Sequence, residues 1–222
     1  KGIDKNNLQG TALSSVALMK IRQGMRLDLS RLIWFGNKSS TNVHYNLMDG
    51  FWGKHFPDLV NAGQVKFIDS NSGAPMAADD GINLLEKMWK AQKLELTGIP
   101  DSVKRFYVSR SVYEQYMEDL EQLGGGDAGR TALINGVQTL AYRGIALVQM
   151  PYWDQYDSVD LNRPNSHRAL LTTPTNLIYA TDLQSSKNAV KIWYEEKEEK
   201  TLYKVKFKGG TSFVHPSLMV IA

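Results

Sequence analysis

The sequence contains no cysteine among its 222 residues. Disulfide bridges, thiolate metal sites and cysteine nucleophiles are therefore excluded from the chemistry of this chain. A chain without thiols fits synthesis in a reducing cytoplasm, where disulfides rarely persist.

Long apolar runs and a large charge excess are also missing. No run approaches the roughly 18 residues of a membrane-spanning helix, and residues 1–10 lack the apolar centre of a secretory signal. The 26 Lys and Arg are nearly balanced by 23 Asp and Glu, which gives a net charge of +3. The basic residues are mixed with acids along the chain, unlike the clustered basic stripe of a nucleic-acid binder. We therefore predict no membrane span and no binding of nucleic acid driven by net charge.

The common catalytic and metal-binding motifs are absent. The four histidines form no pair at a spacing of four residues and no His-Glu-x-x-His motif: His44, His55, His167 and His215. The aspartates within residues 154–160 lack the alternate spacing and central glycine of a calcium loop. The glycine-rich segment 124–130 lacks the Gly-Lys-Ser/Thr ending of a phosphate-binding loop, and no Gly-x-Ser-x-Gly motif occurs. We predict a protein without catalytic, cofactor-binding or metal-binding residues, and therefore not an enzyme.

The first part of the sequence is typical of helices. Apolar residues recur every three or four positions from Leu18 to Leu32 and predict a long helix over residues 7–35, ended by Gly36 and Asn37. At a rise of 1.5 Å per residue this helix is about 40 Å long. A second helix is expected over residues 78–93, with Asp79 or Asp80 as its cap.

A third helix is expected to begin at a capping serine, Ser109 or Ser111, and to end at the glycines that follow residue 123. The later part of the sequence favours strands. Residues 145–148 read as a buried strand that ends at Pro151, and 106–108 as a shorter one. Residues 190–208 alternate between apolar and charged side chains, which predicts a hairpin with 196–199 at its tip. Glycines 209 and 210 are expected to turn the chain before a last strand over 218–222. Helices early and strands late indicate the α+β class.

One aromatic group is a candidate contact surface. Tyr152, Trp153 and Tyr156 follow Pro151 within five residues, in a stretch that also carries several aspartates. Most tryptophans of a globular chain lie in its core, and the same is expected of the others here. Because aromatic residues are enriched at protein interfaces, we predict that Tyr152, Trp153 and Tyr156 are exposed and contact a neighbouring subunit.

Six segments, in their order and spacing, resemble a known family. Residues 26–36 are typical of a helix end that stops at glycine, and residues 49–50 are an Asp-Gly pair. Residues 105–109 are typical of a strand that leads into a helix, and residues 142–151 of a strand that ends at proline. Residues 172–182 run from Thr to Asp, and the closing segment 203–222 contains Gly-Gly and His-Pro. Together they resemble the major capsid proteins of tailed bacteriophages, which have the Hong Kong 97 type of shell fold.

The resemblance implies a particular architecture and function. It implies a peripheral domain, with the long spine helix packed on a β-sheet, from residues 1–75 and 185–222, and a mixed α/β axial domain from residues 76–184. Such subunits self-assemble as pentamers and hexamers into an icosahedral shell around double-stranded DNA, which they contact non-specifically. The implied localisation is the virion, after assembly in the bacterial cytoplasm. No cofactor is implied.

The sequence departs from the family in one respect, and it leaves two other functions open. The family's N-terminal arm and extended loop precede the spine helix, and here the chain begins almost at that helix. An encapsulin-type compartment protein has the same fold and encloses cargo enzymes. An unrelated hydrolase or ligand-binding domain of α+β class would instead require a deep pocket with convergent polar groups.

Overall fold

The computed structural model describes residues 12–70, 73–123, 131–134, 137–181, 190–195, 197–198, 200–205 and 208–222. The chain forms two compact units. Unit 1 comprises Lys1–His55 and Tyr179–Ser212, and unit 2 comprises Phe56–Ile178 and Phe213–Ala222. These divisions differ from those expected at residues 75 and 184. The peripheral and axial roles of the two parts stay predictions.

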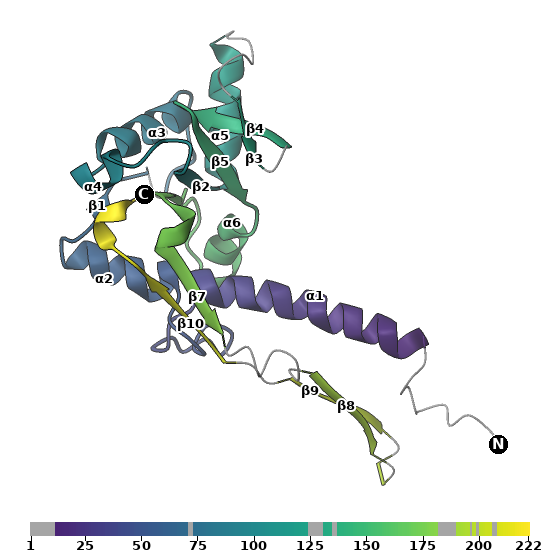
Figure 1. Cartoon of the computed structure of the whole chain (residues 1–222). Helices are drawn as coiled ribbons and strands as arrows, with labels where there is room; N and C mark the ends of the chain where they lie inside the picture. Colours follow the sequence, from purple (N-terminus) through teal and green to yellow (C-terminus); the bar gives the residue numbers. More distant parts are fainter. Residues whose placement is uncertain are drawn as a thin grey trace. The chain divides into compact units, whose positions relative to one another are not determined.

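Unit 1 begins with the predicted long helix. Helix α1 spans Ala12–Phe35, and Figure 1 shows it as one uninterrupted helix. Its apolar stripe is half-buried from Leu18 to Leu29 and becomes fully buried at Leu32. The predicted end at Phe35 is confirmed, while residues 7–11 lie outside the described part. No helix in the described ranges is long and apolar enough to cross a membrane.

Three glycines allow the chain to fold back tightly after α1. Gly36 donates its N–H to Leu32 O at 2.9 Å, and Gly50 donates to Gly36 O at 2.7 Å. A Cβ atom on Gly53 would lie 2.0 Å from Gly36 O, so only glycine fits at that position. The π-helix η1 (Phe51–His55) follows, and its Phe51 ring lies 5.2 Å from that of Trp34. The helix stop predicted at Gly36 is confirmed.

Strands complete unit 1. β8 (Val190–Glu195) and β9 (Lys200–Val205) form the predicted antiparallel hairpin, with Glu195 opposite Lys200. Two of the predicted tip residues, Glu196 and Glu199, lie outside the described residues. The turn expected at residues 209 and 210 is wrong, because both glycines open strand β10 (Gly209–Phe213), which pairs with β7 (Leu177–Thr181). A Cβ on Gly209 would lie 2.6 Å from the Tyr179 hydroxyl, so the glycine leaves room for the Tyr179 ring.

Unit 2 is built on a seven-stranded mixed sheet in the order β1-β11-β6-β2-β5-β4-β3 (Figure 1). The strands not yet given are β1 (Lys66–Phe67), β2 (Arg105–Ser109), β3 (Thr131–Ile134), β4 (Val137–Tyr142), β5 (Ile145–Met150), β6 (Ala169–Thr172) and β11 (Met219–Ile221). Central strand β2 runs parallel to β5 and antiparallel to β6. Strands β6 and β11 are buried at every residue, as expected of strands covered on both faces. The strands predicted at 106–108, 145–148 and 218–222 are confirmed.

Several short helical segments connect these strands. They are α2 (Phe56–Asn61), α4 (Leu94–Thr97), α6 (Trp153–Gln155), the π-helix η2 (Tyr156–Asp160), and the 3-10 turns η3 (Pro174–Asn176) and η4 (Pro216–Leu218). Two longer helices pack with the sheet: α3 (Asp80–Lys90) and α5 (Arg110–Gln122). Leu85 and Met88 of α3 are fully buried in the same apolar cluster as Val112 and Tyr116 of α5. The second and third predicted helices are thus confirmed.

The start of α3 is capped by a residue of α5. Asp119 is fully buried, and its carboxylate accepts hydrogen bonds from the backbone N–H groups of Asp79 at 2.9 Å and Ile82 at 3.1 Å. Gln115 donates a third bond at 2.9 Å. The expectation was a cap from Asp79 or Asp80. The Asp79 side chain makes no cap bond, and the Asp80 carboxylate instead accepts a bond from Ala77 N at 2.8 Å. A carboxylate placed at a helix N-terminus also complements the positive end of the helix dipole.

Candidate functional site

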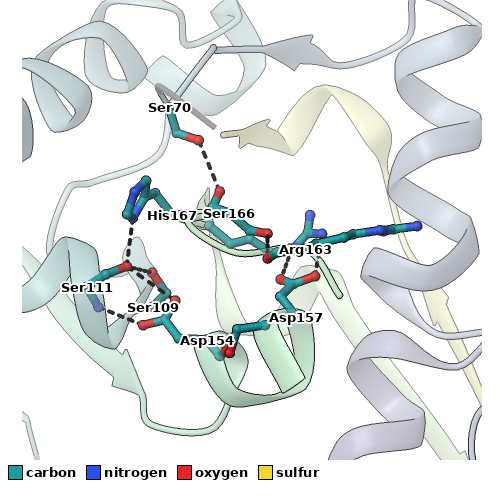
Figure 2. Close-up of polar contacts among 10 residues, drawn as sticks. Ser70, Ser109, Ser111, Asp154, Asp157, Arg163, Ser166 and His167 are labelled. Atoms are coloured by element: carbon teal, nitrogen blue, oxygen red, sulfur yellow. Dashed lines mark hydrogen bonds and ion pairs between the residues drawn. The ribbon is translucent and has the colours of Figure 1, made fainter. Parts of the chain in front are cut away.

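A cluster of polar side chains in unit 2 holds three segments together at the start of α5. It joins the β2–α5 connection, the helical segment 153–160 and the residues just before β6. Figure 2 shows Asp154 and His167 both pointing toward Ser111. Because serine, histidine and aspartate are the residue types of many hydrolases, this cluster is the strongest candidate for chemistry in the described part of the molecule.

Asp154 caps helix α5 from a distance in sequence. Its carboxylate accepts hydrogen bonds from Ser111 N at 2.7 Å and from Ser111 Oγ at 3.2 Å. Ser109 makes no side-chain cap bond; its hydroxyl lies 3.0 Å from that of Ser111. The expected serine cap is therefore wrong, because a carboxylate that lies 43 residues further along the chain occupies the capping position. Such a cap satisfies N–H groups that the helix itself leaves without partners.

His167 connects this cap to a neighbouring loop. Its Nδ1 atom lies 2.9 Å from Ser111 Oγ, and its Nε2 atom lies 2.7 Å from Ala74 O. Since a carbonyl oxygen only accepts hydrogen bonds, Nε2 carries a hydrogen. The Ser111 hydroxyl has a single hydrogen, which Asp154 Oδ1 and Nδ1 of a neutral His167 ring share as acceptors. Ser70 Oγ donates to Ser166 O at 3.2 Å and ties the same loop a second time. The buried imidazole thus acts as a bridge between two loops.

A buried ion pair fixes the other end of the helical segment. Both carboxylate oxygens of Asp157 accept bonds from the Arg168 guanidinium, one of them at 2.9 Å from Nη2. Asp157 is almost fully buried, and its carbonyl also accepts a bond from Arg163 N at 2.7 Å. A fork-to-fork pair of this kind satisfies both charged groups. Segment 153–160 is therefore held at two aspartates, which explains their close spacing without a metal ion.

The geometry differs from that of a catalytic triad in two ways. In a triad the carboxylate orients the histidine, whereas here Asp154 binds the serine and a backbone carbonyl orients His167. The Ser111 N–H is engaged by Asp154, so it is not available to stabilise an oxyanion. His167 and Ser109 are also buried. The arrangement suits a structural network that positions α5.

Two hollows lie elsewhere in the described part of unit 2. One of about 280 Å³ is lined by Asp69, Ser70, Met76, Asp80, Asn83, Leu84 and Lys87. Another of about 230 Å³ lies between α5 and β4 and includes Tyr116 and Arg143. Within the described ranges no group of three or more histidine or acidic side chains is arranged to hold a metal ion. Neither hollow brings together the nucleophile, base and oxyanion donors that a hydrolase requires.

The structure separates the three aromatic residues predicted as a subunit contact. Trp153 is 1% exposed and Tyr156 is 6% exposed, so the expectation that they lie at the surface is wrong. Residues at a spacing of three share one face of a helix, and this face of segment 153–160 points inward. Tyr152 is 43% exposed and its ring stacks on Tyr156 at 6.0 Å. A contact of Tyr152 with another subunit stays a prediction.

Comparison with known proteins gives a likeness of fold. No protein-family model matches the sequence, and no curated protein matches it. One solved structure, the satellite phage P4 procapsid including the size determination (Sid) protein, contains a chain with a TM-score of 0.56 to this one. The alignment covers 95% of this chain and 67% of that chain, at 10% sequence identity. This chain is similar in fold to a procapsid chain.

A second solved structure also matches over most of the length. It is the holo-SrpI encapsulin complex from Synechococcus elongatus PCC 7942, whose chain aligns over 98% of this chain and 67% of its own, at 12% identity and a TM-score of 0.49. The predicted α+β class, with a long helix and a sheet, is confirmed by the structure and by its likeness to the procapsid chain.

Proposed function

We propose that this chain is a structural subunit of an icosahedral viral shell, of a phage or prophage, which assembles from copies of itself around double-stranded DNA. The observation that carries the proposal is the similarity of fold to a phage procapsid chain over 95% of this chain. Under this proposal the protein is a component of the virion and is assembled in the bacterial cytoplasm. Contact with DNA is non-specific, and no catalytic step is involved.

The surface of α1 supports a role in assembly. Val16 and Met19 are 49% and 59% exposed although both are apolar. Exposed apolar area of this kind costs about 25 cal/mol per Å² relative to burial against a partner. Closed symmetric assemblies reuse such surfaces at many equivalent contacts. A long helix that is half-covered in the single chain is therefore well suited to a subunit whose neighbours complete its packing.

The polar cluster around Ser111 supports the absence of catalysis in this proposal. Its carboxylate and imidazole are committed to hydrogen bonds that fix backbone, and its serine N–H is engaged. A catalytic serine requires a free oxyanion site and an accessible nucleophile. The cluster has the composition of a hydrolase site but the connectivity of a structural network.

The test is assembly of the purified full chain. Size-exclusion chromatography and negative-stain electron microscopy should show closed particles of uniform diameter, or pentamers and hexamers that convert to particles on concentration. Particles recovered from cells should contain DNA that resists added nuclease. Particles that enclose a specific protein instead of DNA would indicate an encapsulin-type compartment. A chain that stays monomeric under all of these conditions would contradict the proposed function.

A further inference from the structure

Helix α1 carries a second apolar ridge on the side opposite its half-buried stripe. Val16, Met19, Gln23 and Leu27 follow one another at steps of three, four and four residues, which places them along one side of a helix. Val16, Met19 and Leu27 are each more than 40% exposed. Gly24 has no heavy atom within 4 Å of the position where a Cβ would lie. This face of α1 is therefore open over about three turns.

Positive charge flanks the exposed ridge. Lys20, Arg22 and Arg26 are all exposed, and the acidic residue in this part of the helix, Asp28, bonds to Arg31 at 2.5 Å. Like charges at close range repel, so the same face of α1 in another copy is a poor partner. The complementary surface has to be apolar along its centre and negatively charged beside it.

This requirement distinguishes a protein partner from nucleic acid. Phosphates would neutralise Arg22 and Arg26, but a phosphate backbone would leave Met19 and Leu27 in water. A helix that presents both carboxylates and apolar atoms covers the charges and the ridge together. The observations therefore favour an acidic helical surface as the occupant.

The chain itself offers such a surface on α5. One side of the helix begins at Glu114 and continues three, four and seven residues later at Met117, Glu118 and Glu121. Met117 is 41% exposed, and Glu118 and Glu121 are exposed as well. Glu114 is the member of this group that pairs with a cation of its own helix, Arg110, at 2.6 Å. Charge and apolar character are thus complementary to those of the α1 face.

We propose that the basic, partly apolar face of α1 in one copy docks on the acidic face of α5 in a second copy. Arg22 and Arg26 then pair with Glu118 and Glu121, while Met19 and Leu27 pack against Met117. The contact joins two different surfaces of identical chains, and contacts of this type close into rings when the rotation between copies allows it. The inference rests on the proposed shell function, since it names the contact between copies.

Charge reversal tests the pairing. The variant Arg22→Glu/Arg26→Glu and the variant Glu118→Arg/Glu121→Arg should each lower the yield of assembled particles by about tenfold or more, because like charges then face one another. The variant with all four changes should recover most of the yield. Circular dichroism is expected to be unchanged, since all four reversed side chains are exposed in the single chain. Lys66→Glu and Glu95→Arg, two exposed charges on other elements, are the matched controls and should assemble normally.

The absence of cysteine permits a second readout. In the variant Met19→Cys/Met117→Cys, mild oxidation should give disulfide-linked dimers and higher species on a non-reducing gel, while each single variant should give much less. Disulfide formed only within one chain, or none, would overturn the proposal. So would a four-fold variant that assembles no better than the double variants, or double variants that assemble as the wild type does. If the wild-type chain forms no particles, the shell function fails by itself, and crosslinking of concentrated protein still decides whether this contact exists.

Discussion

Individual buried side chains hold helices of unit 2 in position through hydrogen bonds to their backbone. Asp119 is the clearest case, because its carboxylate is fully buried and receives bonds from two backbone N–H groups and one amide. Substitution of a buried acceptor that has several donors lowers stability strongly, because each donor loses its partner and gains no hydrogen bond to water.

We expect Asp119→Asn to lower the free energy of unfolding by about 1–3 kcal/mol. The asparagine has one acceptor oxygen in place of two, and its NH₂ group would face a backbone N–H donor. Urea unfolding of the full chain followed by circular dichroism measures the change. The adjacent exposed residue provides the control: Glu118→Gln should stay within about 0.5 kcal/mol of the wild type. Equal effects of the two variants would show that Asp119 does not cap α3 in solution.

Tyr107 on β2 makes stability depend on pH at the alkaline end. Burial raises the pKa of the Tyr107 phenol above its ordinary value, and the nearby Arg105 charge opposes this to a smaller extent. The folded chain therefore holds the phenol proton more tightly than the unfolded chain does. The corresponding stability is complete below about pH 10, where the unfolded phenol ionises, and is lost as the pH rises through the raised folded pKa.

We expect Tyr107→Phe to reduce the loss of stability between about pH 9 and pH 11. Urea unfolding at several pH values, for wild type and variant, gives the two slopes. Tyr152→Phe, which removes an exposed phenol, is the matched control and should leave the slope of the wild type. A Tyr107→Phe slope that equals the wild-type slope would contradict the assignment of this titration to Tyr107.

At the scale of elements, the end of α1 depends on a close approach of backbone to backbone. Gly36, Gly50 and Gly53 bring the chain after the loop directly against the last turn of the helix. The same helix contains Gly24, which has open space around it. The two kinds of glycine should respond in opposite directions to an added methyl group.

We expect Gly53→Ala to destabilise the fold by about 2 kcal/mol or more, because its Cβ would lie 2.0 Å from Gly36 O and backbone has to move. Gly24→Ala should instead stabilise α1 by about 0.5–1 kcal/mol, since alanine has the higher helix propensity. Thermal unfolding of both variants measures the contrast. Destabilisation by both, or by neither, would show that the junction after α1 is not packed as described.

At the scale of the whole molecule, two neighbouring residues are expected to contribute differently to folding and to assembly. Trp153 is buried in unit 2 whereas Tyr152 beside it is exposed. A cavity left by a buried tryptophan is costly, while truncation of an exposed tyrosine removes little packing.

We expect Trp153→Ala to destabilise the monomer by about 3–5 kcal/mol, so that particles are lost through unfolding. Tyr152→Ala should leave the monomer folded, and if Tyr152 contacts another subunit it should lower particle yield alone. Thermal unfolding and electron microscopy of both variants separate the two effects. A stable Trp153→Ala monomer that fails to assemble would restore Trp153 as a contact residue.

The features that could be predicted from the sequence are those set by local periodicity. A repeat of three and four residues marks α1 up to Phe35, and alternation at every second residue marks the β8–β9 hairpin. Helix α1 ends before Gly36, as expected. Each of these signals depends on neighbours within a few positions, because helix and strand periods are properties of the local backbone.

The tertiary structure alone decided which partners the polar groups have. Helix α3 is capped by Asp119, which accepts a bond from the N–H of Ile82, 37 residues away in the sequence. Helix α5 is capped by Asp154, which accepts a bond from the N–H of Ser111, 43 residues away. The same holds for the burial of Trp153. The spacing of three residues between Trp153 and Tyr156 indicates that they share one face of a helical segment. Only the packing of segment 153–160 shows that this face is buried. Contacts of long sequence separation have no local pattern, so the sequence determined the elements while the fold determined how they are held together.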